Sequence, residues 1–235
     1  GNQRLSAKNF IIATGSIVAR PFIQGLEEVD YLTSDEALEL SDLPESMIVL
    51  GGGPVALELA QFFLRIGVRV TLIQRCGHVL SDADEDLAEP VEARFREEGM
   101  QVFTGTSIQK VTESENRKTV HFLHNGRPQQ VTAVAILQAL GRRPNIDGLQ
   151  LEAAQLSPHH GRIVVDHTMR TSQPHIYAVG DVNGLHEIVH IAIEQGEIAG
   201  WNATHPLEPP KRYHERLKAQ VVFTDPQVAS VGLSE

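Results

Sequence analysis

Apolar residues along this 235-residue chain repeat with two different periods, and the changes of period separate predicted strands from predicted helices. The continuous apolar run 47–50 predicts a short buried strand, and 55–67 carries apolar residues at helical spacing. A second strand is predicted at 68–73, which gives the strand, helix, strand order of a βαβ unit. A second helix, with acidic residues at its start, is expected at 84–98, and a third strand at 100–105.

The pattern changes after this point, because residues 108–137 form short alternating or apolar runs separated by polar turns. Asn125-Gly126 is a strong hairpin signal, so an antiparallel meander attached to a parallel sheet is expected. The resulting fold class is α/β. Further strands are predicted at 10–13, 135–141, 162–166 and 175–181, and a helix is predicted at 186–202.

Composition and charge narrow the possible partners. A net charge of −10 and a pI near 5.5 argue against binding to nucleic acid or to an anionic membrane. No apolar run reaches the roughly 20 residues that span a bilayer, and no signal peptide is recognisable, so a cytoplasmic location is expected. Cys76 is the single cysteine, which excludes an intrachain disulfide. The abrupt apolar beginning and end of the sequence lead us to expect a fragment.

The segment 49–58, VLGGGPVALE, fits the G-x-G-x-x-G/A dinucleotide fingerprint, with Ala56 in the third position. Gly51 allows a tight turn, and Gly53 allows the backbone to approach a pyrophosphate. The free amides of the helix that begins near Pro54 would meet the phosphate charge. An ordinary glycine turn is the alternative, but its position between a strand and a helix favours a dinucleotide.

The end of the second predicted strand bears on the choice of dinucleotide. An NAD-selective site usually has an acid here for the ribose 2′-hydroxyl, whereas this chain has Gln74 and Arg75. Gln74 does not repel a 2′-phosphate, and Arg75 offers it a charged partner. NADP(H) is therefore favoured over NAD(H), unless Arg75 is an ordinary solvated loop cation.

The segment 186–190, HEIVH, matches the H-E-x-x-H signature of zinc proteases if both histidines share a helix face. The extended metzincin pattern requires a glycine and a further histidine, but Ile193 and Gly196 occupy these positions. A zinc hydrolase is therefore a remote alternative. No metal site is assigned, and incidental histidines are the preferred interpretation.

Four further stretches, together with the fingerprint, resemble the flavin-dependent pyridine nucleotide-disulfide oxidoreductases, which include dihydrolipoamide dehydrogenase, mercuric reductase and glutathione reductase. They are IIATGS (11–16), ALGRRPN (139–145), TSQPHIYAVGD (171–181) and FTDPQVASVG (223–232). The resemblance implies a Rossmann-like NAD(P)-binding domain with a β-meander, inserted into a partial FAD-binding domain of the same type. It implies FAD and NAD(P) as cofactors.

The resemblance also implies roles for individual residues. Asp181 matches the acid that contacts the flavin ribityl chain, Glu58 the group that approaches the nicotinamide amide, and Ile108 an adenine contact. Backbone amides near Val189 and His190 would face the flavin pyrimidine ring. No catalytic residue is assigned. The full set of expected cofactor-binding residues is Thr14, Gly15, Gly51, Gly52, Gly53, Pro54, Val55, Ala56, Glu58, Gln74, Arg75, Ile108, Gly141, Arg142, Asp181, Val189 and His190.

Four functional segments follow from the same resemblance. They are the end of the first part of the FAD domain (1–25), the NAD(P) domain (26–157), the second part of the FAD domain (158–205), and a linker with the start of an interface domain (206–235). The family's FAD pyrophosphate fingerprint and redox-active C-x-x-x-x-C pair precede ATGS and are not in this sequence. Pro54 also replaces an aromatic residue that shields the flavin in some members.

The expected parent is a homodimeric flavoprotein, closest in type to dihydrolipoamide dehydrogenase, that passes hydride from NAD(P)H to FAD and then to a disulfide or related small acceptor. The isolated fragment is expected to be inactive. A non-catalytic dinucleotide-binding module or a redox sensor is the alternative from another class. The sequence does not identify the electron acceptor.

Overall fold

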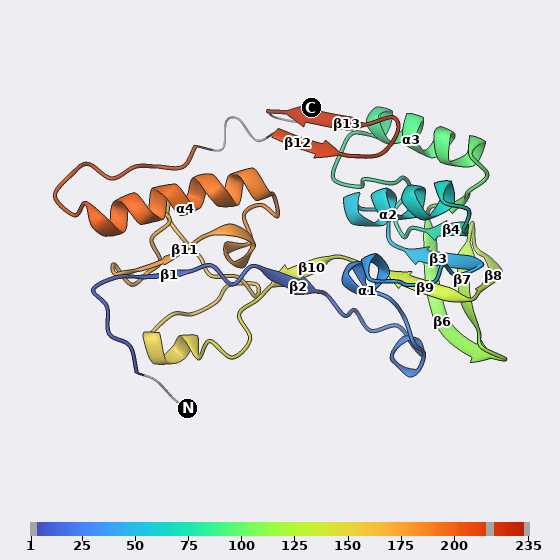
Figure 1. The fold of residues 1–235 in the computed structure, drawn as a ribbon, viewed down its shortest axis with the longest axis horizontal. Helices are drawn as coiled ribbons and strands as arrows, with labels where there is room; N and C mark the ends of the chain where they lie inside the picture. The colour runs from blue at the N-terminus through green and yellow to red at the C-terminus, as the bar shows by residue number, and fades with distance from the viewer. Residues whose placement is uncertain (1–3, 215–218, 233–235) are drawn as a thin grey trace. The chain divides into compact units, whose positions relative to one another are not determined.

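The computed structural model describes residues 4–214 and 219–232, which form two compact units (Figure 1). The first unit contains residues 4–17 and 142–214, and the second contains 18–141 and 219–232. These limits differ from those of the four functional segments expected from the sequence, which remain a prediction. The α/β class is confirmed, since helices accompany both parallel and antiparallel sheets.

A four-stranded parallel sheet, in the order β5-β4-β3-β9, is the centre of the second unit. Helix α2 follows β3, and helix α3 lies between β4 and β5 in the chain. The predicted βαβ segment is therefore present. The strands are β3 (Ser46–Leu50), β4 (Arg69–Ile73), β5 (Gln101–Phe103) and β9 (Ala135–Gln138), and the helices are α2 (Pro54–Arg65) and α3 (Glu85–Glu97).

Alternation along β3 explains why its positions 47–50 are all apolar. Met47 and Val49 belong to a buried cluster with residues of α2 and α3, whereas Ile48 and Leu50 belong to a second cluster with residues of the meander. Both faces of the strand are covered over 47–50, which favours apolar side chains at all four positions. Gly67, with φ of 100°, follows the end of α2 and allows the chain to turn into β4.

The predicted antiparallel meander is formed by β6 (Thr106–Ser114), β7 (Arg117–His124) and β8 (Arg127–Ala133), in that order. Asn125 and Gly126 both have positive φ, as their hairpin requires. The last part of the region that the sequence assigned to the meander belongs instead to β9 of the parallel sheet.

Shorter elements complete the second unit. They are η1 (Leu26–Glu28), α1 (Ser34–Leu38) and an antiparallel hairpin of β12 (Ala219–Val222) and β13 (Val228–Val231). Val222 and Val228 of this hairpin are buried in the same cluster as α2 and α3. The hairpin is therefore part of the second unit's core.

The first unit contains a two-stranded parallel sheet, β1 (Phe10–Ile12) with β11 (Ile176–Ala178), in agreement with the two strands predicted there. Strand β2 (Ser16–Val18) pairs with β10 (Arg142–Pro144). The remaining elements are the short helices η2 (Leu151–Ala154) and η3 (Gly180–Asn183) and the helix α4 (Val189–Thr204).

Two expectations for the first unit were wrong. Residues 162–166 do not form a strand, because their backbone groups bond to turns: Ile163 N donates to Val182 O, and Asp166 N donates to Arg170 O. The last helix begins at Val189 rather than at 186, since Ile188 has an extended backbone. Within residues 4–214 and 219–232, no helix has the length and apolarity to cross a bilayer.

Candidate functional site

The glycine loop between β3 and α2 uses each of its three glycines differently. A Cβ on Gly51, whose φ is 120°, would lie 2.2 Å from the carbonyl oxygen of Ala139. A Cβ on Gly52 would lie 2.8 Å from the Gln74 side chain. At Gly53 no atom lies within 4 Å of that position. Gly51 is required by backbone packing, a Cβ on Gly52 would displace the Gln74 side chain, and Gly53 leaves space beside the backbone that a ligand could occupy.

Helix α2 begins at the end of this loop with its first amides available. The N-cap residue is Gly53, so no capping side chain accepts a hydrogen bond from these amides. Pro54 occupies the first helical turn, and that turn contains no acidic residue. The amides of Val55 and Ala56 therefore point, with the positive end of the helix dipole, toward the open side of Gly53. This arrangement can accept a pyrophosphate.

Glu58 lies one helical turn beyond the loop and is half-buried. Helical side chains lean toward the N-terminus, which brings this carboxylate back over the first turn. Its Oε1 atom accepts a hydrogen bond of 2.8 Å from the backbone N–H of Phe223. Among the described residues, no group donates to Oε2.

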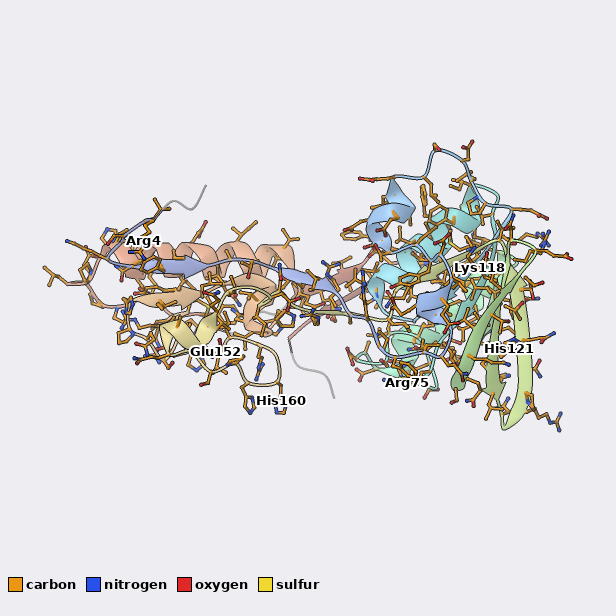
Figure 2. All side chains as sticks on the ribbon, turned by 90° about the horizontal axis from the view of Figure 1, so that it is seen from below. Arg4, Arg75, Lys118, His121, Glu152 and His160 are labelled. Carbon is orange, nitrogen blue, oxygen red and sulfur yellow. The ribbon has the colours of Figure 1, made fainter. Side chains whose placement is uncertain are left out.

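Gln74 and Arg75 are adjacent but have different surroundings. Gln74 is buried, its Oε1 accepts from Arg75 N at 2.9 Å, and its side chain lies against Gly52. A direct contact of Gln74 with a ribose would have to replace these interactions. Arg75 is exposed at the surface of the second unit (Figure 2), and its guanidinium has no hydrogen-bond partner among the described residues.

Two other expected contacts belong to the second unit. Ile108 lies on β6 beside a bulge. It is partly buried and packs against the cluster that Ile48 and Leu50 form with the meander. Gly141 has a φ of 109° and its carbonyl accepts from Ala19 N at 3.0 Å. Gly141 therefore occupies a conformation that other residues adopt only with strain.

In the first unit, three side chains form a chain of hydrogen bonds. Arg142 donates through Nε to Ser16 Oγ at 2.7 Å, and Ser16 Oγ donates to Asp181 Oδ2 at 2.6 Å. Arg142 also donates to the Ser16 carbonyl at 2.9 Å. The sequence pointed to Arg142 and Asp181, but not to the serine that connects them. These hydrogen bonds fix one oxygen of the Asp181 carboxylate.

The neighbouring loop and turn are fixed by further contacts. Thr14 Oγ1 donates to Asn145 O at 2.7 Å, and Asn145 N donates to Gly15 O at 2.8 Å. Gln195, which sequence reasoning missed, is fully buried, and its Oε1 accepts from Gly180 N and Asn183 Nδ2. This glutamine holds the turn that contains Asp181. Nothing local in the sequence distinguishes it from an exposed helical glutamine.

Helix α4 begins with two of the expected residues, Val189 and His190, both exposed. No side chain caps its start and no acidic residue lies in its first turn. Glu187 precedes the helix, and partial burial, together with the negative charge of Asp181, raises its pKa above the usual range, while Arg142 opposes the shift. An acid of this kind was not expected from the sequence.

The premise of the zinc interpretation is wrong, because His186 precedes α4 and does not share a helix face with His190. His186 lies near Tyr213, with ring centroids 6.3 Å apart. In the described part of the chain, no three His, Cys, Asp or Glu residues are grouped as a metal site would require.

Comparison with known proteins identifies the family of this chain. Residues 1–196 match the family model described as pyridine nucleotide-disulphide oxidoreductase. The chain is 36% identical over 234 residues to a mercuric reductase of Staphylococcus aureus, and 35% identical over 245 residues to a dihydrolipoyl dehydrogenase of Bacillus subtilis. The chain belongs to the pyridine nucleotide-disulphide oxidoreductase family, as the resemblance predicted.

Solved structures agree with this assignment. The HOCl-induced flavoprotein disulfide reductase RclA of Escherichia coli superposes with a TM-score of 0.91 at 28% identity, over 100% of this chain and 53% of that one. LpdA of Mycobacterium tuberculosis gives 0.83 at 32% identity, over 95% and 48%. The matches cover 99% of this chain and 42% of the mercuric reductase, and 100% and 49% of the dihydrolipoyl dehydrogenase. The chain thus spans about half the length of its relatives.

Proposed function

We propose that this chain supplies the NAD(P)-binding part and some of the FAD-binding part of a flavoprotein oxidoreductase. The parent passes hydride from NAD(P)H to FAD and on to a disulfide or a related acceptor, in the manner of dihydrolipoamide dehydrogenase. The glycine loop carries this proposal, because Gly53 is open beside an uncapped helix start. The family assignment supports the same function.

The second unit's residues fit a dinucleotide. The Val55 and Ala56 amides receive the pyrophosphate, and Glu58 orients the carboxamide of the nicotinamide. Arg75 pairs with a 2′-phosphate, so NADP(H) is the preferred form. Ile108 contacts the adenine in this proposal.

The first unit's residues fit part of an FAD site. Asp181, fixed by Ser16, accepts hydrogen bonds from the ribityl hydroxyls, and the amides at Val189 and His190 face the pyrimidine edge of the flavin. The flavin supplies hydride acceptance and electron transfer when it is bound. The chain's own residues hold and orient it; none of them is assigned to proton transfer.

A titration with NADPH and NADH tests the nucleotide assignment. Wild type is expected to bind NADPH at least as tightly as NADH, and Arg75→Ala is expected to weaken NADPH alone, because the 2′-phosphate loses its cation. A preference of wild type for NADH by tenfold, about 1.4 kcal/mol, contradicts the NADP(H) assignment. Absence of binding of either nucleotide contradicts the site.

A non-catalytic nucleotide-binding module or a redox sensor is the second candidate. The reductase requires a parent with a C-x-x-x-x-C pair before ATGS, and sequencing the parent gene distinguishes the two.

A further inference from the structure

One face of helix α2 carries three polar side chains directed at the C-terminal hairpin segment. Glu58, Gln61 and Arg65 are spaced i, i+3 and i+7, which places them in one stripe along the helix. Glu58 accepts from Phe223 N, and the other two contact Asp225. Phe223 and Asp225, the latter 164 positions beyond Gln61 in the chain, are thereby attached to the helix that begins at the glycine loop.

Gln61 makes the most specific of these contacts. Its Nε2 donates to Asp225 O at 2.9 Å, and its Oε1 accepts from Asp225 N at 2.8 Å, so the side-chain amide pairs with both backbone groups of one residue. Gln61 is only 4% exposed. Removal of a buried amide partner leaves two backbone groups unsatisfied, which makes this pairing the strongest part of the attachment.

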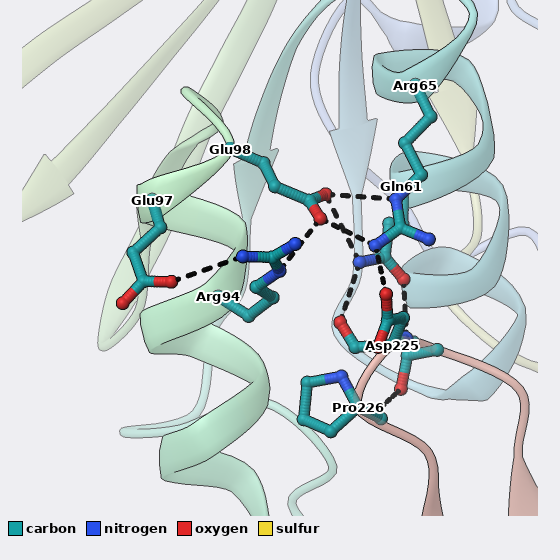
Figure 3. A network of polar contacts seen from close by, with 8 residues as sticks. Gln61, Arg65, Arg94, Glu97, Glu98, Asp225 and Pro226 are labelled. Atoms are coloured by element: carbon teal, nitrogen blue, oxygen red, sulfur yellow. Dashed lines mark hydrogen bonds and ion pairs between the residues drawn. The ribbon is translucent and has the colours of Figure 1, made fainter.

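Charged residues surround the pairing (Figure 3). Arg65 Nη2 donates to Asp225 Oδ2 and to Glu98 Oε1, both at 2.6 Å, and Gln61 Nε2 donates to Glu98 Oε2 at 3.2 Å. Arg94 on α3 pairs with Glu98 at 3.0 Å but does not reach Asp225. Gln61, Arg65, Glu98 and Asp225 are called the Asp225 network below. Arg65 and Asp225 are largely exposed, so their ion pair adds less than the Gln61 pairing.

The network determines where the Phe223 amide lies. Phe223 is two residues before Asp225, and Val222 is buried in the core, so this short segment is fixed on both sides. Its N–H then holds Oε1 of Glu58, while Oε2 accepts no hydrogen bond from the described residues. A carboxylate held through one oxygen presents the other in a defined direction, which suits a single amide donor of a ligand.

We propose that Gln61 and the Asp225 network are positioning groups that, through the Phe223 amide, orient Glu58 toward the carboxamide of a bound nicotinamide. This inference rests on the proposed function, since it takes the dinucleotide site at the glycine loop as given. It adds that residues 223–225 are part of the specificity of that site for the nicotinamide half. The pyrophosphate half depends on the loop and not on the network.

Comparison of NADH with ADP-ribose, which lacks the nicotinamide, separates positioning from general damage. Gln61→Met removes both hydrogen bonds to Asp225 at nearly constant volume. The variant is expected to bind NADH at least fivefold more weakly than wild type does. Its affinity for ADP-ribose is expected to stay within twofold of the wild-type value, as measured by calorimetry. Arg65→Ala is expected to act in the same direction with a smaller change. Arg94→Ala, which removes another arginine paired with Glu98, is the matched control and leaves both affinities unchanged.

A double-variant cycle tests whether the effect passes through Glu58. In a Glu58→Ala background, Gln61→Met is expected to cause no further loss of NADH affinity, because the group that it positions is gone. Equal weakening of NADH and ADP-ribose, full additivity in the cycle, or unchanged NADH affinity in Gln61→Met overturns the inference. If wild type binds none of NADPH, NADH and ADP-ribose, the proposed site itself fails, which is a distinguishable result.

Discussion

The two units bury their sheets to very different extents. In the second unit, four parallel strands have apolar clusters on both faces, and Phe63 of α2 is 1% exposed. In the described part of the first unit, β1 pairs with β11 alone, and Phe10 and Ile11 are each 44% exposed. Val189 and Ile193 of α4 are 78% and 58% exposed. The second unit therefore contains the features of an independently stable domain, whereas the first depends more on hydrogen-bonded turns.

This difference bears on function. The proposed nucleotide site is formed by residues of the second unit alone, on a loop fixed by close packing at Gly51 and Gly52. The proposed flavin contacts are formed by the first unit. There, hydrogen bonds from Arg142 to Ser16 and from Ser16 to Asp181 hold the Asp181 carboxylate in place. We therefore expect substitutions in the first unit to weaken nucleotide binding less than substitutions in the second unit weaken flavin binding.

The largest expected effect is a difference between the two units in the stability lost when a phenylalanine is truncated. Phe63→Ala is expected to lower the free energy of unfolding of the second unit by about 3–5 kcal/mol, because it leaves a cavity under α2. Phe10→Ala is expected to cost the first unit less than about 2 kcal/mol, because much of that ring is already exposed. Urea denaturation followed by amide signals from each unit measures both. Equal losses would show that the units do not differ as described.

The next largest effect is the loss of stability expected from a substitution in the glycine loop. Gly51→Ala is expected to destabilise the second unit by about 3 kcal/mol or more, since it adds a steric collision with Ala139 to an unfavourable φ. Gly67→Ala has a similarly positive φ but free space, so about 1–2 kcal/mol is expected. Thermal unfolding of the two variants is the measurement. A Gly67→Ala loss as large as that of Gly51→Ala would mean that packing against Ala139 is unimportant.

The smallest expected effect concerns pH. The hydrogen bond from Arg65 lowers the pKa of Glu98 below its usual 4.5, so the folded state holds the charged form more strongly than the unfolded state. The stabilisation is complete above the unfolded pKa and is lost as the pH falls through the folded value. Glu98→Gln should reduce the acid sensitivity of the second unit by up to about 1 kcal/mol. Urea midpoints for wild type and variant at pH 7 and in the acid range provide the test, and parallel profiles would contradict it.

The sequence predicted the elements that depend on local pattern. The βαβ order, the Asn125-Gly126 hairpin and the helix over 84–98 follow from periodicity and turn chemistry, which act within a few residues. The segment 162–166 resembles a strand locally but pairs with no strand among residues 4–214 and 219–232, and pairing is a tertiary property. Gln61 and Asp225 are 164 residues apart, and Ser16 and Asp181 are 165 apart, so only the fold reveals these contacts.

The most direct test of the nucleotide site is the affinity of Gly53→Val for NADPH, measured by calorimetry beside wild type. No atom lies within 4 Å of a Cβ at Gly53 and its φ is −83°, so the variant is expected to fold with a loss of about 1 kcal/mol or less. The added side chain would occupy the space assigned to the pyrophosphate. We expect wild type to bind NADPH and the folded variant to bind it at least tenfold more weakly. Unchanged affinity in a folded Gly53→Val protein would contradict it.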